Sequence, residues 1–101
     1  MAKPVVDPLD SVMRRGRRVH RPGFSVYWLP LTVPLAPRIV VGQKVDKRAT
    51  VRNLIRRRIR SVLSQAHLRG VGLVVVGRKP ILELTFQQLK ADLGRILQQI
   101  K

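Results

Sequence analysis

The sequence contains no cysteine and has few acids and histidines, five and two respectively. Without cysteine, neither a disulfide framework nor a thiolate metal site can form. The acids are scattered along the chain, at Asp7, Asp10, Asp46, Glu83 and Asp92. No two of them form a pair suited to general acid–base catalysis, and neither His20 nor His67 has an acid or a nucleophile at a suggestive spacing. We therefore predict no catalytic residue and no metal site, and we expect both histidines to be ordinary surface or boundary residues.

Long hydrophobic runs are also missing. A membrane-spanning helix needs about 18 consecutive apolar residues, and the longest apolar stretch, residues 71–76, is short and interrupted by Gly72. Residues 1–10 do not show the charged and then apolar plan of a secretory signal. We therefore expect a cytoplasmic protein that does not bind a membrane.

The abundant feature is positive charge. Lys and Arg number 21 against five acids, which gives a net charge of +16 and an isoelectric point near 12.0. Self-repulsion at this charge opposes folding, and a polyanionic partner would relieve it while releasing condensed counterions. Nucleic acid is the first candidate for that partner. With 101 residues, of which 45% are hydrophobic, we predict one domain spanning residues 1–101, with a single core.

Hydrophobic periodicity and turn residues predict six elements in the order helix, strand, strand, long helix, strand, helix. Their expected bounds are residues 7–16, 24–29, 38–45, 48–69 and 73–76, with the last helix after Pro80. Segment 48–69 repeats apolar residues at helical spacing and is followed by Gly70. Segment 73–76 is apolar throughout, which is typical of a strand covered on both faces. This order predicts an α+β fold, a single small domain whose sheet is packed by helices.

Local signals mark the ends of two of these helices. Asp7 followed by Pro8 is typical of an N-cap and a first helical position. Gly16 is expected to end that helix. Thr85, followed three residues later by Gln88, predicts a capping box at the start of the last helix.

The long helix carries a column of arginines. Arg48, Arg52, Arg56 and Arg60 are spaced by four, so they stack on one face, and no acid lies three or four residues away within the column. Each like-charge pair costs about 0.2–0.5 kcal/mol. The column is either a solvated basic face or a phosphate clamp, and the use of Arg favours the clamp because guanidinium binds phosphate in a bidentate manner. Asn53 beside it either bonds locally to the backbone or reads a base edge or 2′-hydroxyl.

Tyr27 is the candidate for stacking on a base. In the strand over residues 24–29, Phe24, Val26 and Trp28 share one face, which we expect to be buried. Tyr27 shares the other face with Ser25. Its ring either stacks on a single-stranded base or merely covers the sheet with its hydroxyl in water.

Residues 41–60, VGQKVDKRATVRNLIRRRIR, resemble the signature of the bacterial ribonuclease P protein family. That family has a strand, a Ser-Lys-Lys type of turn and a helix that opens with Arg-Asn-Arg and further basic residues. Arg52 and Asn53 match the first two positions of Arg-Asn-Arg, Leu54 stands at the third, and Met13 replaces an aromatic of the family's first helix. The other matching basic residues are Lys44, Lys47, Arg48, Arg56, Arg57 and Arg60. Flanking segments match as well, so the resemblance covers residues from about 9 to 100.

A member of this family is the protein subunit of a ribonucleoprotein endonuclease that removes the 5′ leader from precursor tRNA. The resemblance implies that the RNA subunit performs the catalysis, with Mg²⁺ bound mainly by that RNA. It implies contact with the RNA subunit through Lys44, Lys47, Arg48, Arg52, Asn53, Arg56, Arg57 and Arg60. It implies contact with the leader through Tyr27, Met13 and Val40. It further implies a left-handed βαβ crossover, which is rare among parallel strands, and no obligate protein partner.

Other classes of basic protein are alternatives. A small ribosomal or general RNA-binding protein without a nuclease role would share the charge, although such ribosomal proteins usually carry long basic tails. A helix-turn-helix DNA-binding module would need a second helix within a few residues of the first, and the predicted strands stand in the way.

Overall fold

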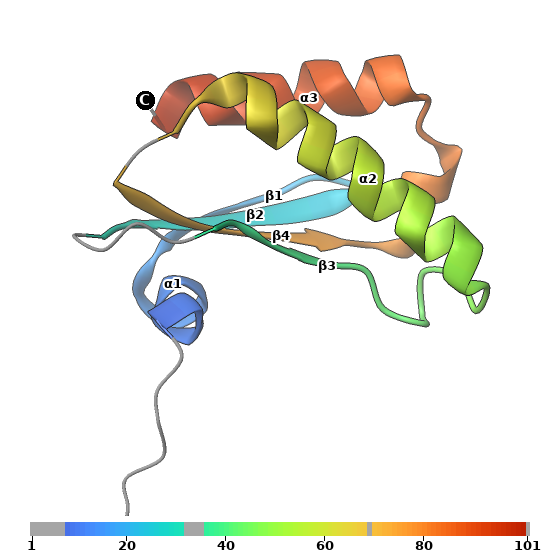
Figure 1. Cartoon of the computed structure of the whole chain (residues 1–101), viewed down its shortest axis with the longest axis horizontal. Coiled ribbons are helices and arrows are strands. Elements are labelled where there is room, and N and C mark those ends of the chain that lie inside the picture. Colours follow the sequence, from blue (N-terminus) through green and yellow to red (C-terminus); the bar gives the residue numbers. More distant parts are fainter. Residues whose placement is uncertain (1–7, 32–35, 69, 101) are drawn as a thin grey trace, which may run out of the picture.

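The computed structural model describes residues 8–31, 36–68 and 70–100. Its elements are α1 (Pro8–Arg15), β1 (Arg17–His20), β2 (Phe24–Pro30), β3 (Arg38–Val40), α2 (Ala49–Ala66), β4 (Val71–Gly77), the 3-10 helix η1 (Lys79–Glu83) and α3 (Phe86–Ile100). The sheet forms a middle layer, with α2 and α3 on one face and α1 on the other (Figure 1). The predicted α+β fold, with helices packed on a sheet, is confirmed.

The sheet has the strand order β1-β2-β4-β3. β2 pairs antiparallel with β1 and β4, whereas β3 and β4 are parallel neighbours. α2 connects these two parallel strands. In Figure 1, β3 lies nearest the viewer, both strands run from left to right, and α2 crosses above them, so the connection turns to the left. This is the crossover that the family resemblance implies.

Strand alternation divides the core between the two faces of the sheet. On the face beneath α2 and α3, Phe24, Val26 and Val75 are fully buried and pack with residues of both helices. On the opposite face, Val12 of α1 packs against Val74, and both are fully buried. β4 is therefore covered on both faces, as its apolar sequence predicts. Trp28 lies on the expected face, but it is only half-buried.

Two of the predicted helix ends are confirmed. At the end of α1, the backbone N–H of Gly16 donates to the carbonyl oxygen of Val12 at 2.9 Å. A side chain at Gly16 would collide with the backbone oxygen of Trp28, so only glycine fits there. At the start of α3, the hydroxyl of Thr85 accepts from the N–H of Gln88 at 3.1 Å, and the Gln88 amide oxygen accepts from the N–H of Thr85 at 2.9 Å.

Other predicted bounds need correction. The strand expected over residues 38–45 ends at Val40, because the chain turns and the N–H of Val45 donates to the carbonyl oxygen of Gly42 at 3.0 Å. The long helix ends at Ala66, because His67 adopts the left-handed conformation, with φ of 52°. Strand β1 was not predicted, since its sequence, RRVH, has no run of apolar residues. The expected cap at Asp7 lies outside the described residues.

Candidate nucleic-acid interface

α2 has a buried face and an opposite face that carries guanidinium groups. The buried residues are Ile55, Ile59, Val62 and Leu63. Arg57 and Arg60 are exposed on the other side, while Arg52 and Arg56 lie half-buried at the border. This division follows from the 3.6-residue period of the helix. Packing of the apolar stripe on the sheet therefore determines where the arginines point.

Arg48, the first residue of the predicted column, is paired. Its backbone N–H donates to Oδ1 of Asp46 at 2.8 Å, and its Nε and Nη2 donate to Oδ1 and Oδ2, both at 3.1 Å. The hydrogen bonds from the Arg48 side chain and backbone hold the pKa of Asp46 below its usual range. The expectation of an unpaired column is thus wrong at Arg48, because its partner lies two residues away rather than three or four. These contacts fix the turn before α2, whose N-cap residue Arg48 makes no side-chain capping hydrogen bond.

Arg52 and Arg56 are partly used to hold the segment that precedes α2. Nη1 of Arg52 donates to the carbonyl oxygens of Asp46 and Lys47 at 3.0 and 2.8 Å. Nη2 of Arg56 donates to the carbonyl oxygen of Val41 at 3.0 Å. A guanidinium has five N–H groups, so each keeps donors for a ligand. These two arginines therefore combine a structural role with the charge of the surface.

Asn53 is exposed, and its amide oxygen accepts from Nη1 of Arg56 at 2.8 Å. This contact leaves the amide N–H groups directed away from the arginine, because only the amide oxygen can accept. Asn53 makes no hydrogen bond to the helix backbone within the described residues. Of the two roles considered from the sequence, local competition with the backbone is therefore not the one that the structure displays. Contact of Asn53 with RNA stays a prediction.

The remaining cations of the predicted surface have no hydrogen-bonded or ionic partner in the parts of the chain that the structure describes. They are Lys44, Lys47, Arg57 and Arg60, and all four are exposed. Leu54, at the position where the family has its second arginine, is also exposed, at 42% of its surface. Free guanidinium and ammonium groups of this kind can bind phosphate without first breaking an internal ion pair.

The other predicted contact residues lie on the α1 side of the structure. Tyr27 faces away from α2 and is half-buried against the small cluster formed by Val12 and Val74. Val40 is 38% exposed on the same sheet face, and Met13 of α1 is 40% exposed. The expectation that Tyr27 lies opposite Trp28 is confirmed. The structure thus leaves an aromatic ring and aliphatic groups accessible, which suits contact with unstacked bases.

A polar cluster on this same face was not predicted. Nδ1 of His20 lies 2.7 Å from Oγ of Ser25, and Nε of Arg78 donates to the same oxygen at 2.9 Å. Nη2 of Arg78 lies 3.4 Å from Nδ1 of His20. The cluster depends on β1, whose pairing with β2 sets His20 opposite Ser25. His20 is a surface residue, as expected, but its ring is held in this cluster.

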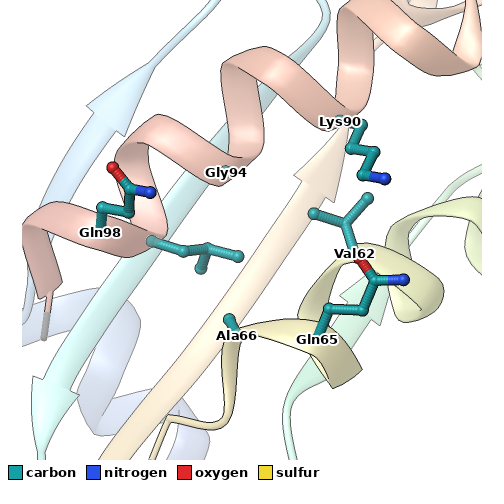
Figure 2. A pocket seen from close by; sticks show the side chains of 7 residues that line it. Val62, Gln65, Ala66, Lys90, Gly94 and Gln98 are labelled. Carbon is teal, nitrogen blue, oxygen red and sulfur yellow. The ribbon is translucent and has the colours of Figure 1, made fainter.

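A hollow lies between α2 and α3, on the opposite side of the sheet (Figure 2). It is lined by Val62, Gln65, Ala66, Lys90, Gly94, Leu97 and Gln98. Lys90 is the sole charged side chain of this lining, and Gly94 has open space beside it. The lining of the hollow contains no acid, histidine or hydroxyl group.

The residues that the structure describes include no group of three or more His, Cys, Asp or Glu side chains that could hold a metal ion. Among the same residues, no helix is long and apolar enough to cross a membrane.

The fold and the surface together define a small, strongly basic α+β domain whose exposed cations suit a polyanionic partner. A family model described as Ribonuclease P matches residues 8–101. The chain therefore belongs to the ribonuclease P protein family, as its motifs indicate.

Individual relatives agree with this assignment. The chain is 39% identical over 87 residues to the ribonuclease P protein component of Thermus scotoductus, covering 86% of this chain and 52% of the relative. It is 34% identical over 108 residues to that of Chloroflexus aggregans, covering 86% and 79%. The chain spans about half the length of the Thermus relatives that it matches.

Solved structures share the fold. The Staphylococcus aureus RNase P protein superposes with a TM-score of 0.78 at 24% identity, covering 96% of this chain and 94% of that one. The Thermotoga maritima RNase P protein gives a TM-score of 0.78 at 22% identity, covering 93% and 92%. These likenesses extend over nearly the whole domain, so the sheet order and both helical layers belong to the family fold.

Proposed function

We propose that this protein is the protein subunit of ribonuclease P, which binds the catalytic RNA and the 5′ leader of precursor tRNA and so supports endonucleolytic removal of the leader. Family membership favours this function over that of a small ribosomal or general RNA-binding protein. The observation that carries the proposal is the surface of free cations on α2 and its preceding loop, in a chain with a net charge of +16. Such a surface suits a phosphate backbone.

The two sides of the molecule have different tasks in this proposal. Lys44, Lys47, Arg57 and Arg60 contact phosphates of the RNA subunit, and Asn53 adds a directional hydrogen bond. The leader lies on the α1 side of the sheet, against Tyr27, Val40 and Met13. The RNA subunit performs the hydrolysis and binds most of the Mg²⁺. The proposal further places the protein in the cytoplasm and requires no obligate protein partner.

The salt dependence of RNA binding tests the phosphate contacts. We expect the double variant Arg57→Gln/Arg60→Gln to flatten the log–log salt slope by about 1.4–1.8, at roughly 0.7–0.9 for each lost phosphate contact. Its stability should be unchanged, because neither guanidinium bonds within the described residues. Arg52→Gln/Arg56→Gln should reduce the slope and also destabilise the loop that these arginines hold. Binding of the RNA subunit would be measured by filter retention at several salt concentrations.

Lys90→Gln/Arg95→Gln on α3 is the matched control, since it removes the same charge from a different surface. This control should leave the slope nearly unchanged. Equal slopes for the two double variants would show that binding depends on net charge alone and would contradict the proposed surface. Reconstitution with the RNA subunit from the same organism, followed by cleavage of precursor tRNA, tests the function itself.

A further inference from the structure

Ser25 is the centre of a polar cluster on the α1 side of the sheet, where register also places Arg18 and Arg38 in the neighbouring row with Tyr27 and Val74. Its side chain is fully buried, with contacts to Nδ1 of His20 at 2.7 Å and Nε of Arg78 at 2.9 Å. These partners come from a neighbouring strand and from the residue that follows β4, 53 positions further along the chain. The cluster therefore depends on the tertiary fold.

The hydrogen-bond partners of His20 determine which nitrogen of its neutral ring carries the proton. Arg78 can only donate, so Oγ of Ser25 accepts from it and has one proton left to give. If Nδ1 of His20 carried a proton, the buried hydroxyl proton would have no acceptor among the described residues, and Nδ1–H would point at the N–H groups of Arg78, 3.4 Å away. With Nδ1 unprotonated, both contacts are satisfied. The neutral ring then carries its proton on Nε2.

The cluster lies toward the β1 edge of the sheet, on the side that carries α1. Register places His20, Ser25, Val76 and Val40 in one row that runs from the β1 edge to the β3 edge. The His20 ring also contacts the Tyr27 ring edge to face, with centroids 6.2 Å apart. His20 and Arg78 are both exposed. A donor pair, one neutral and one charged, thus lies at one end of a row whose other end is aliphatic.

We propose that His20 and Arg78 form a binding site for a phosphodiester group of single-stranded RNA, in which Nε2–H of His20 and the free N–H groups of Arg78 donate to the same phosphate. Ser25 is the positioning residue, because its hydroxyl orients both side chains. The bases that follow this phosphate then lie over Val76 and Val40, beside Tyr27. The inference rests on the proposed function, since it specifies how one strand is held on the α1 side of the sheet.

Binding of a short, unstructured RNA oligonucleotide to the full chain separates the two donors. In this proposal the imidazole donates as the neutral ring and releases no counterion, so His20→Ala should weaken binding about two- to tenfold without changing the log–log salt slope. Arg78→Gln should weaken binding and flatten the slope by roughly 0.7, the value for one phosphate contact on a single strand. His20→Gln should recover most of the affinity, because its amide can accept from Ser25 and still donate outward. Lys90→Gln is the control on the opposite face.

Three results would overturn the site. One is unchanged affinity in His20→Ala, and a second is a change of salt slope in that variant. The third is a loss of affinity in His20→Ala that occurs with RNA but not with DNA of the same sequence. That result would assign the contact to the ribose 2′-hydroxyl and not to the phosphate. Nitrogen-15 NMR of the imidazole ring supplies a separate readout. We expect Nδ1 to be unprotonated and Nε2 protonated in the free protein, and a protonated Nδ1 would contradict the tautomer.

Failure of this inference and failure of the proposed function can be distinguished. If reconstituted enzyme cleaves precursor tRNA while His20→Ala binds the oligonucleotide as the unmodified protein does, only the inference is wrong. If the oligonucleotide results hold and no cleavage is reconstituted, the site stands and the proposed function is wrong.

Discussion

At the scale of single residues, the arginines at the start of α2 divide between two kinds of partner. Arg48 pairs with the Asp46 carboxylate, whereas Arg52 and Arg56 donate to backbone carbonyl oxygens of the segment before the helix. Arg57 and Arg60 have no partner in the described ranges. Residues that look equivalent by their spacing in the sequence therefore differ in what their removal would disturb.

Substitution of Asp46 should affect stability and RNA binding in opposite directions. The folded-state pKa of Asp46 is lowered, so its contribution to stability is present above the unfolded pKa of about 3.9 and is lost as the pH falls through the folded value. Asp46→Asn should therefore lower the melting temperature at pH 7, and the difference from the unmodified protein should be smaller at pH 3, below the unfolded pKa. The same variant frees Arg48 and should steepen the salt slope of RNA binding.

Circular dichroism melts at both pH values would measure the stability effect. Asp92→Asn is the control, because Asp92 has no hydrogen-bonded partner in the described part of the chain. A melting difference for Asp46→Asn that is as large at pH 3 as at pH 7 would contradict the role of the ionised carboxylate.

The ring of Tyr27 is placed so that it can pack against the protein on one side and stack on an RNA base on the other. We expect Tyr27→Ala to weaken binding of precursor tRNA to the reconstituted enzyme by about 1–3 kcal/mol, the usual contribution of a stacked base, with little effect on mature tRNA. Unfolding free energy should also fall, because the ring packs partly against Val12 and Val74. Tyr27→Phe keeps the ring and should retain binding. Equal losses for precursor and mature tRNA would show that Tyr27 supports the sheet and not the leader.

At the scale of elements, α2 and α3 each have a periodic apolar stripe, but different contacts form their ends. α2 begins with the Asp46 carboxylate accepting from Arg48 and ends where His67 takes the left-handed conformation. α3 begins with the reciprocal hydrogen bonds of Thr85 and Gln88. Four residues of α3, namely Leu89, Leu93, Ile96 and Leu97, are buried, so fraying at its start would loosen contacts with the core.

Removal of the cap should destabilise the domain by a measurable amount. Thr85→Ala should lower the free energy of unfolding by about 1 kcal/mol, within the usual range for loss of an N-cap hydroxyl. Thr85→Ser keeps the oxygen and should cost much less. Urea unfolding followed by circular dichroism would measure both, and equal midpoints for the alanine variant and the unmodified protein would contradict the contribution of the capping box.

At the scale of the whole molecule, positive charge dominates, with a net charge of +16. The described residues bring together no cluster of acids and histidines, and the polar cluster at Ser25 contains a guanidinium and an imidazole but no carboxylate. Under the proposed function, the chain positions RNA and leaves hydrolysis to the RNA subunit.

This division of tasks can be tested by substitution across the whole surface. With the RNA subunit, protein and Mg²⁺ all saturating, we expect no single side-chain substitution to abolish cleavage of precursor tRNA, although many should raise the concentrations needed. Single-turnover cleavage by each variant, with RNA binding measured in parallel, would check this. A variant that binds RNA normally and yet stops turnover would place part of the chemistry on the protein.

Local features of the sequence predict the three α-helices, three of the four strands and the sign of the partner's charge. The apolar repeat of residues 51–66 specifies a helix with one buried face, and Thr85 with Gln88 specifies the start of α3, because these patterns involve residues within one or two turns. The uniform apolar run of β4 predicts burial on both faces. Charge alone indicates a polyanion.

Only the tertiary structure decided which side chains act together. Pairing of β1 with β2 brings His20 to Ser25, and the antiparallel β2–β4 pair brings Arg78 to the same hydroxyl, 58 positions from His20. The loop before α2 presents its carbonyl oxygens to Arg52 and Arg56 because the chain leaves β3 at Val40 rather than continuing as a strand. Helical and strand periods describe one segment at a time. Contacts across the sheet follow from register between distant segments, which a single sequence does not specify.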